Sequence, residues 1–188
     1  MRISTPLTGT LIAAAALLAS PGPAAAAPTP TDLKPVAVLS AERLATADLV
    51  AAAKWGTDSP IDDPAREQQV LDSVAAQAQQ AGADPDEVRR VFRDQIEANK
   101  TVQRGLYRRW TAHPEQAPTT KPDLGVVRQK INRINTDLVT ALADSTPLRT
   151  RPTCEPELAL AVVEVHHERH PDLLHTGALV RSLASVCR

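Results

Sequence analysis

Two pairs of polar side chains and one polar cluster have types and spacings that could hold a small anion. Arg43 and Lys54 are eleven residues apart, which on a helix is about three full turns plus 20°, so both project from one face. Asn99 and Gln103 are four apart on a stripe that is otherwise apolar, and burying an amide without a partner costs roughly 1–3 kcal/mol. The remaining cluster lies at the expected start of a helix, where the helix end adds positive potential, and consists of Asp63, Arg66 and Glu67.

Each of these residues also has an ordinary explanation when it is taken alone. Arg43 or Lys54 could be a solvated surface charge, and Asp63 could be only a helix cap. The two amides could form a structural polar pair between helices. Taken together, however, the residues describe a pocket between helices with several cations and amide donors and few bases. Such a pocket suits a small organic dianion.

Helices must position these side chains, because apolar residues recur at three- and four-residue steps throughout the chain and no segment alternates with period two. Asp63-Pro64 and Asp84-Pro85 each combine an N-cap with a proline in the first turn, which predicts where two helices start. We therefore predict an all-α single domain of about six helices, over residues 40–55, 64–82, 85–110, 123–142, 157–169 and 172–186.

Composition excludes several classes of function. The chain has 188 residues, which suits one domain, and a formal net charge of -1. This charge argues against a nucleic-acid or membrane-surface binder, so we expect neither partner. Only 2% of the residues are aromatic although 43% are hydrophobic. Small aliphatic residues therefore dominate the core, and any bound anion must be held by a local group of cations.

The first 26 residues have the pattern of a secretory signal peptide. Arg2 precedes an apolar run at 11–19 that is too short to span a membrane comfortably, and a small-residue cleavage pattern ends at Ala26. We expect residues 27–188 to form the mature protein, exported to the periplasm or cell envelope or secreted, with no membrane contact. The alternative is an uncleaved membrane anchor.

Cys154 and Cys187 are the only cysteines of the chain. A disulfide is the expected state of such a pair outside the cytosol, and it would close a C-terminal helical hairpin over about 154–187. Two free buried thiols are the alternative.

The common catalytic motifs are missing from the sequence. It contains no GxSxG, no HExxH and no glycine-rich phosphate loop. His166 and His170 have a spacing that could bind a metal, but no third ligand is evident. Solvated histidines are the better interpretation, and we expect no metal and no cofactor.

Three segments together resemble the all-helical chorismate mutases, and are most similar to their exported gamma subclass. The segments are RLATADLVAAAKW, SPIDDPARE and FRDQIEANKTVQRGLYRRW, and they contain the linked spacing R-x10-K-x8-D-x2-R. The resemblance continues through PDLGVVRQKIN and the two cysteines. It implies the all-helical chorismate mutase fold, with catalytic helices over about 38–142. It also implies a homodimer and the rearrangement of chorismate to prephenate by a [3,3] shift without a cofactor.

The resemblance also implies roles for individual residues. Arg43 resembles the arginine that clamps a substrate carboxylate, and Lys54 the lysine that binds a carboxylate and the ether oxygen. Gln103 matches the second ether-oxygen donor, where some relatives have Glu. The residues expected to line the pocket near the ring hydroxyl and carboxylate are Asp63, Arg66 and Glu67, together with Asn99, which stands where the family often has Ser or Thr.

One further arginine completes the implied site. In the intracellular dimers it comes from the partner subunit, whereas in the exported subclass it lies on a later helix of the same chain. Arg128 stands at that place, and Arg133 is the alternative. Two rival interpretations remain: an exported, non-catalytic interaction protein that retains the scaffold, and a different anion-binding helical protein.

Overall fold

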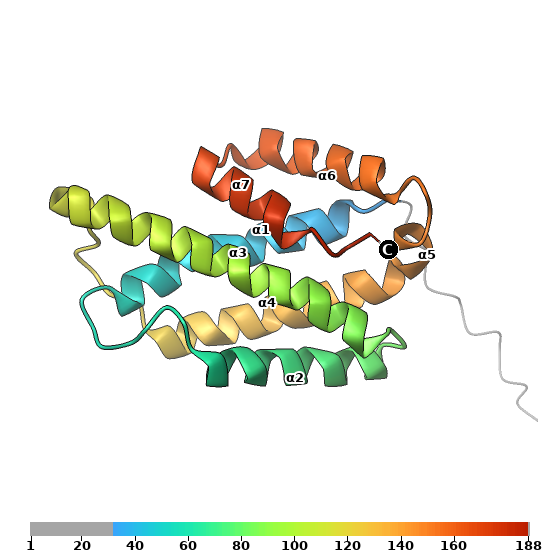
Figure 1. The fold of residues 1–188 in the computed structure, drawn as a ribbon, viewed down its shortest axis with the longest axis horizontal. Coiled ribbons are helices and arrows are strands. Elements are labelled where there is room, and N and C mark those ends of the chain that lie inside the picture. The colour runs from blue at the N-terminus through green and yellow to red at the C-terminus, as the bar shows by residue number, and fades with distance from the viewer. Residues whose placement is uncertain (1–31, 188) are drawn as a thin grey trace, which may run out of the picture.

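The computed structural model describes residues 32–187, so the predicted signal peptide lies outside the described residues. Within 32–187 the chain forms α-helices and one short 3₁₀ helix and no strands, which confirms the predicted all-α class (Figure 1). The elements are α1 (Lys34–Lys54), α2 (Pro64–Gln80), α3 (Pro85–Ala112), η1 (Pro114–Gln116), α4 (Leu124–Asp144), α5 (Thr146–Arg149), α6 (Cys154–Arg169) and α7 (Leu173–Ser182).

Aspartate caps set the starts of the helices that carry the polar residues. Asp63 Oδ1 accepts a hydrogen bond from the backbone N–H of Arg66 at 3.0 Å, and Pro64 follows as the first residue of α2. Asp84 caps α3 and Asp123 caps α4 in the same way. These side chains satisfy backbone donors that have no partner inside the helix. The predicted starts of α2 and α3 are therefore confirmed.

Several helices differ in extent from the prediction, and one short helix was not predicted. Helix α6 begins at Cys154, three residues before the predicted start. Helix α1 begins at Lys34 rather than near residue 40, with Pro35 in its first turn. Helix α7 ends at Ser182, four residues before the predicted end. The four-residue helix α5 lies within residues 143–156, between two predicted helices, where the sequence predicts no helix. A helix this short has little stability of its own, so the contacts of its buried residues, Leu148 and Arg149, must hold it in place.

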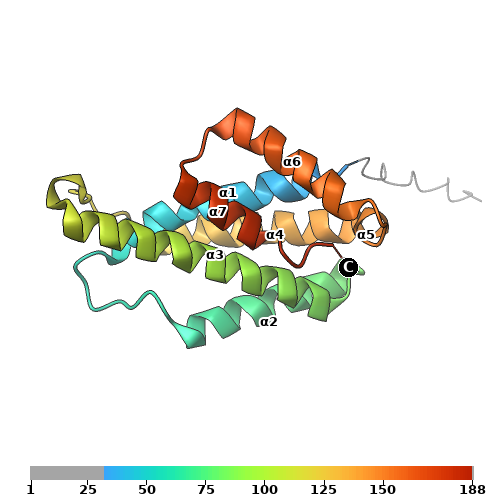
Figure 2. The same cartoon turned by 45° about the horizontal axis from the view of Figure 1, so that its top comes forward.

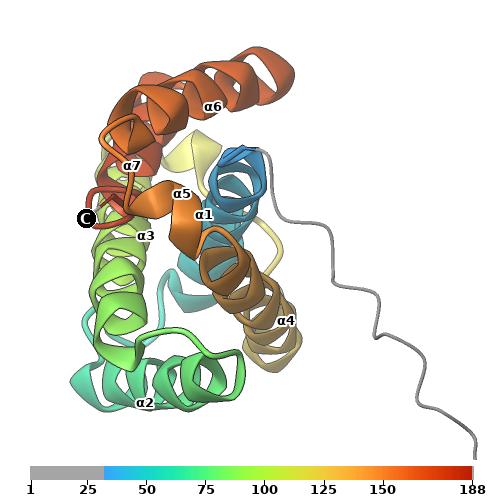
Figure 3. The ribbon, with the colours of Figure 1, turned by 90° about the vertical axis from the view of Figure 1, so that its right-hand side faces the viewer.

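Helix α1 lies in the middle of the molecule. It packs against α3 and α4 on one side and against α6 and α7 on the other. The end-on view shows α2 beneath α3 and α4, and the hairpin of α6 and α7 at the opposite edge (Figure 3). Fully buried side chains such as Phe92, Leu138 and Val165 fill the space between these layers. Residues 34–144 thus form a four-helix unit to which the C-terminal hairpin is attached.

The C-terminal hairpin is closed by the predicted disulfide. Cys154 and Cys187 are bonded, which confirms the pairing, and α7 lies along α3 while α6 covers α1 (Figure 2). His175 of α7 also bridges Asp172 at 2.7 Å and Asp48 of α1 at 3.1 Å. The hydrogen bond to Asp48 is the main reason that the pKa of His175 rises to about 9. The hairpin is therefore linked to α1 through His175, near the turn between α6 and α7, and the disulfide joins its two open ends.

Replacing both Cys154 and Cys187 by serine is expected to lower the free energy of unfolding by about 2–4 kcal/mol, because the bridge restricts the unfolded chain. Neither cysteine lines the pocket described below, so activity at low temperature is expected to survive. Thermal unfolding of the wild type with and without reductant, compared with the double variant, measures the effect. A wild type whose melting temperature is unchanged by reduction would contradict it.

Candidate active site

One pocket lies between helices α1, α2, α3 and α4, with Ile61 of the α1–α2 connection at its edge. All the site residues predicted from the sequence line it: Arg43, Lys54, Asp63, Arg66, Glu67, Asn99, Gln103 and Arg128. The alternative arginine, Arg133, is exposed on α4 and is not among the lining residues. The structure therefore brings the predicted residues together from α1, from α2 and its N-cap, from α3 and from α4.

Arg43 is buried at the inner end of the pocket. Its Nε donates to Asn135 Oδ1 of α4 at 2.9 Å, and its Nη1 donates to the backbone oxygen of Gln95 on α3 at 3.0 Å. The ring of Phe92 lies 5.6 Å from the guanidinium carbon. Burial lowers the pKa of Arg43 to about 10. The side chain is therefore still cationic at neutral pH and is held between two neighbouring helices.

Lys54 ends α1 and points toward the α1–α2 connection. Its Nζ donates to the backbone oxygen of Pro60 at 2.6 Å, and the residue is 8% exposed. Burial lowers the pKa of Lys54, and Asp63 opposes this effect while Arg128 adds to it. Arg128 lines the same pocket as Lys54. An anionic ligand between these two cations would relieve their repulsion.

Asn99 and Gln103 form a hydrogen-bonded pair on α3. Gln103 Nε2 donates to Asn99 Oδ1 at 2.7 Å. Gln103 is 3% exposed, and its Oε1 is buried without a hydrogen-bond partner among the described residues. Only one of its two amide N–H groups is used in this pair. Asn99, which is half-buried and also lines the pocket, thus holds one side of the Gln103 amide.

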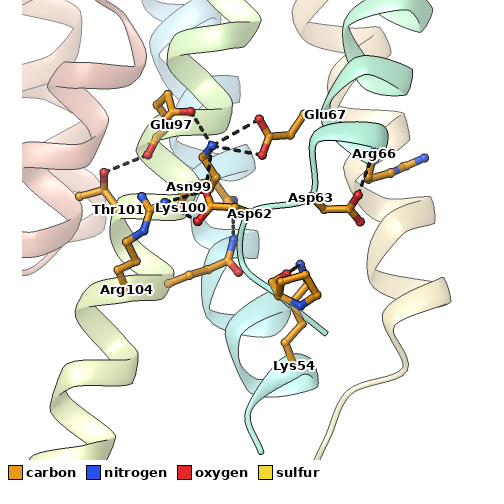
Figure 4. Close-up of polar contacts among 12 residues, drawn as sticks. Lys54, Asp62, Asp63, Arg66, Glu67, Glu97, Asn99, Lys100, Thr101 and Arg104 are labelled. Atoms are coloured by element: carbon orange, nitrogen blue, oxygen red, sulfur yellow. Dashed lines mark hydrogen bonds and ion pairs between the residues drawn. The ribbon is translucent and has the colours of Figure 1, made fainter. Parts of the chain in front are cut away.

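Lys100 was missed by the sequence prediction although it also lines the pocket (Figure 4). Its Nζ contacts Glu97 at 2.6 Å, Glu67 at 3.1 Å and Asp62 at 3.2 Å. Burial would lower the pKa of Lys100, but these carboxylates together raise it. Lys100 lies four residues after Ile96 and three before Gln103. This helical spacing is the sequence signal that could have predicted an inward position. Glu67 is therefore already paired with a cation.

Asp62 extends this network to the connection between α1 and α2. Its carboxylate accepts from Arg104 Nη2 at 2.7 Å as well as contacting Lys100. Figure 4 shows Asp62 beside both cations, with Lys54 at the end of α1, where the connection begins. The segment that carries Ile61 into the pocket is thus fastened to α3 by charge pairs.

The remaining predicted residues lie on α2 and α4. Asp63 is occupied as the cap of α2. The Arg66 guanidinium donates two long hydrogen bonds to amide oxygens, at 3.3 Å to Gln69 of α2 and at 3.4 Å to Asn132 of α4. Arg128 is half-buried and forms no hydrogen bond or ion pair with another residue of 32–187. Among the described residues neither Arg66 nor Arg128 is paired with a carboxylate, so both guanidinium groups can bind an anionic ligand.

The charges and side-chain types of the pocket limit its chemistry. Five cationic and two acidic side chains line it, and the lining includes no cysteine, serine or histidine. Both acids are engaged, one as a helix cap and one with Lys100. The pocket can therefore bind a small dianion and stabilise developing negative charge with fixed donors. Among the described residues, no group of three or more metal-binding side chains could hold a metal ion.

Comparison with known proteins identifies relatives of this chain. The family described as "Chorismate mutase type II" matches residues 36–104. The chain is 38% identical over 177 residues to the "Secreted chorismate mutase" of Mycolicibacterium smegmatis, covering 94% of this chain and 98% of that protein. It is 35% identical over 149 residues to the "Secreted chorismate mutase" of Mycobacterium tuberculosis, covering 79% of this chain and 75% of that protein.

The fold is shared with a solved structure as well. The crystal structure of chorismate mutase from Burkholderia thailandensis aligns with a TM-score of 0.79 and 36% sequence identity, and covers 82% of this chain and 98% of that one. Sequence similarity that spans nearly the whole of a relative, together with a common fold, places the protein: it belongs to the chorismate mutase type II family.

Proposed function

We propose that this protein is a chorismate mutase, an isomerase that converts chorismate to prephenate by a cofactor-free [3,3] rearrangement. The observation that carries the proposal is the pocket itself. It combines an excess of cations with a buried amide donor, and it lies in a chain similar to named chorismate mutases over most of its length. Chorismate is a dicarboxylate, so its charge is complementary to that of the pocket.

The arginines bind and orient the substrate in this proposal. Arg43 and Arg128 each hold a carboxylate through charge-assisted hydrogen bonds, which fix both ends of a flexible molecule. Holding the enolpyruvyl side chain over the ring brings the two carbons that must bond into contact, and this orientation supplies a large part of the rate. Asp63, Arg66, Glu67 and Asn99 line the rest of the pocket, with Glu67 keeping Lys100 in place.

Lys54 and Gln103 act on the bond that breaks. The ether oxygen gains negative charge as its bond to the ring lengthens, and two donors held in the pocket would stabilise that charge. The Lys54 ammonium keeps two N–H groups beyond the one bonded to Pro60, and the Gln103 amide keeps one beyond that bonded to Asn99. The reaction needs no general acid or base.

We further propose that the protein is exported, belongs to the gamma subclass and forms a homodimer. Relatives named as secreted support export, as does the composition of residues 1–26. Over residues 32–187, the structure has no helix that is both long and apolar enough to cross a membrane. Mass spectrometry of protein recovered outside the cytosol would locate the cleavage site, and analytical ultracentrifugation would give the assembly state.

The proposed function is tested by following the loss of chorismate absorbance with purified protein, and by detecting prephenate as the product. Turnover that saturates with chorismate supports the proposal. If the protein binds chorismate without converting it, an anion-binding role replaces the enzymatic one. If it neither binds nor converts chorismate, the scaffold serves interaction alone.

Replacing Arg128 by alanine is expected to lower kcat/KM by about 10–100-fold, because a charge-assisted contact to a substrate carboxylate is lost. Arg133→Ala, on the same helix but exposed and outside the pocket, is the matched control and is expected to behave as wild type. Steady-state kinetics of both variants provide the measurement. Equal losses in the two variants would place the clamping arginine elsewhere.

A further inference from the structure

Arg43 is held by Asn135, a residue that the sequence does not predict to belong to the site. Of the five N–H groups on a guanidinium, the one on Nε is bonded to Asn135 and one on Nη1 to the backbone of Gln95. The Arg43 guanidinium makes no other hydrogen bond or ion pair within residues 32–187. Three N–H groups are left for a ligand. The direction in which they point is set by the two bonds already made.

Asn135 comes from the helix that also carries Arg128. The two residues are seven apart on α4, which is about two helical turns, so they share one face. Arg128 lies in the pocket, whereas Asn135 is 4% exposed and lies behind it against Arg43. One face of α4 thus carries Arg128, one of the two proposed clamping arginines. The same face holds the other, Arg43, through Asn135.

The choice of an amide at this position matters physically. The Asn135 oxygen is a neutral acceptor, so it fixes the plane of the guanidinium without cancelling its charge. A carboxylate there would form an ion pair with Arg43 and weaken its attraction for a substrate carboxylate. Gln95 on the far side likewise contributes a backbone oxygen rather than a charge, and the Phe92 ring limits rotation. Arg43 therefore keeps its full charge and a single orientation.

We propose that Asn135 is a positioning residue for Arg43: by accepting the Nε hydrogen bond it aims the remaining N–H groups at a substrate carboxylate. The proposal rests on the function proposed above, since it assigns Arg43 to that carboxylate. It adds a residue that does not line the pocket and acts only through Arg43.

The test is a double-mutant cycle on chorismate turnover. Asn135→Leu, which keeps the size of the side chain and removes the acceptor, is expected to lower kcat/KM about tenfold, since a small misplacement of a clamping group is costly. The change is expected mainly in KM, because the carboxylate contact is weakened. In an Arg43→Lys background, which has no Nε–H to hold, Asn135→Leu is expected to change kcat/KM less than about twofold. Gln129→Leu, an exposed amide on the same helix, is the matched control.

The outcomes separate the two proposals. A wild type that does not turn over chorismate overturns both. An active wild type with an unaffected Asn135→Leu variant overturns the positioning role alone. Equal losses in both Arg43 backgrounds also overturn the positioning role. A loss confined to kcat at unchanged KM overturns it too, because that pattern indicates a smaller folded fraction. If Asn135→Leu fails to give the helical circular dichroism of wild type, Asn135→Ala enters the same cycle under the same criteria.

Discussion

Replacing Gln103 by alanine is expected to lower kcat by about 10²–10³-fold, the loss seen when a preoriented donor to a developing oxyanion is removed. Gln103 is 3% exposed and its amide is already held by Asn99 at 2.7 Å. Its free N–H therefore needs no reorientation when charge develops on the ether oxygen. The substrate carboxylates are bound by other residues, so KM is expected to change much less than kcat.

The charge of the side chain at this position gives a second measurement. Glutamate at position 103 can donate a hydrogen bond only when it is protonated, and its ordinary pKa is about 4.3. Gln103→Glu is therefore expected to be active mainly at acidic pH and to lose activity toward neutrality. Burial would raise the pKa of the new carboxyl and the Lys54 ammonium would lower it. Wild type, with an uncharged amide, is expected to be comparatively flat over the same range.

Gln129→Glu is the control for these variants, because it adds the same charge on an exposed face of α4 outside the pocket. Profiles of kcat/KM against pH for wild type, both Gln103 variants and this control make the comparison. If Gln103→Glu equals wild type at neutral pH while its carboxyl is ionised, Gln103 does not contact the ether oxygen, and the proposed mechanism fails at that point.

The largest effect on stability is expected at Arg149, far along the chain from the pocket residues. Its side chain is 1% exposed, and its Nε and Nη1 donate to the backbone oxygens of Val186 at 3.0 Å and Leu142 at 2.9 Å. Nη2 contacts the carboxylate of Glu87 at 3.3 Å. Burial lowers the pKa of Arg149. One guanidinium thus joins the end of α4, the start of α3 and the C-terminal segment.

Arg149→Met is expected to lower the free energy of unfolding by about 3–5 kcal/mol, because it leaves two buried backbone oxygens without their donor and removes the buried ion pair with Glu87. Urea unfolding with the disulfide intact measures the change. Arg151→Met, two residues farther on and exposed, is the control, with an expected change below about 0.5 kcal/mol. Similar midpoints for Arg149→Met and wild type would show that this guanidinium adds no net stability.

The sequence predicts the parts of this fold that depend on neighbours along the chain. Asp63-Pro64 and Asp84-Pro85 are local, because a cap and its first-turn proline act within four residues, and the structure begins α2 and α3 there. Helix α5 could not be predicted in this way. It has four residues, too few to be stable alone, and Arg149 holds it through contacts with distant segments.

In the site, too, local features could be predicted from the sequence and contacts between distant segments could not. Helical spacing was enough to predict that Arg43 and Lys54 share a face, and the resemblance to a family supplied Arg128. The partner of Arg43, however, is 92 residues away at Asn135, and no pattern within one helix connects the two. Lys100 was missed for a related reason: a lysine on a helix is usually solvated, and here three carboxylates from two other segments and its own helix make its burial favourable.

All the side chains that line the pocket belong to one polypeptide, and they come from helices α1 to α4 and the connection between the first two. We therefore expect each chain to act as a catalytic unit by itself. Turnover per chain is then expected not to depend on protein concentration, so dilution that separates subunits should leave it unchanged. Mixing a Gln103→Ala chain with an Arg128→Ala chain is likewise expected not to restore activity, because each pocket would lack one of its own residues.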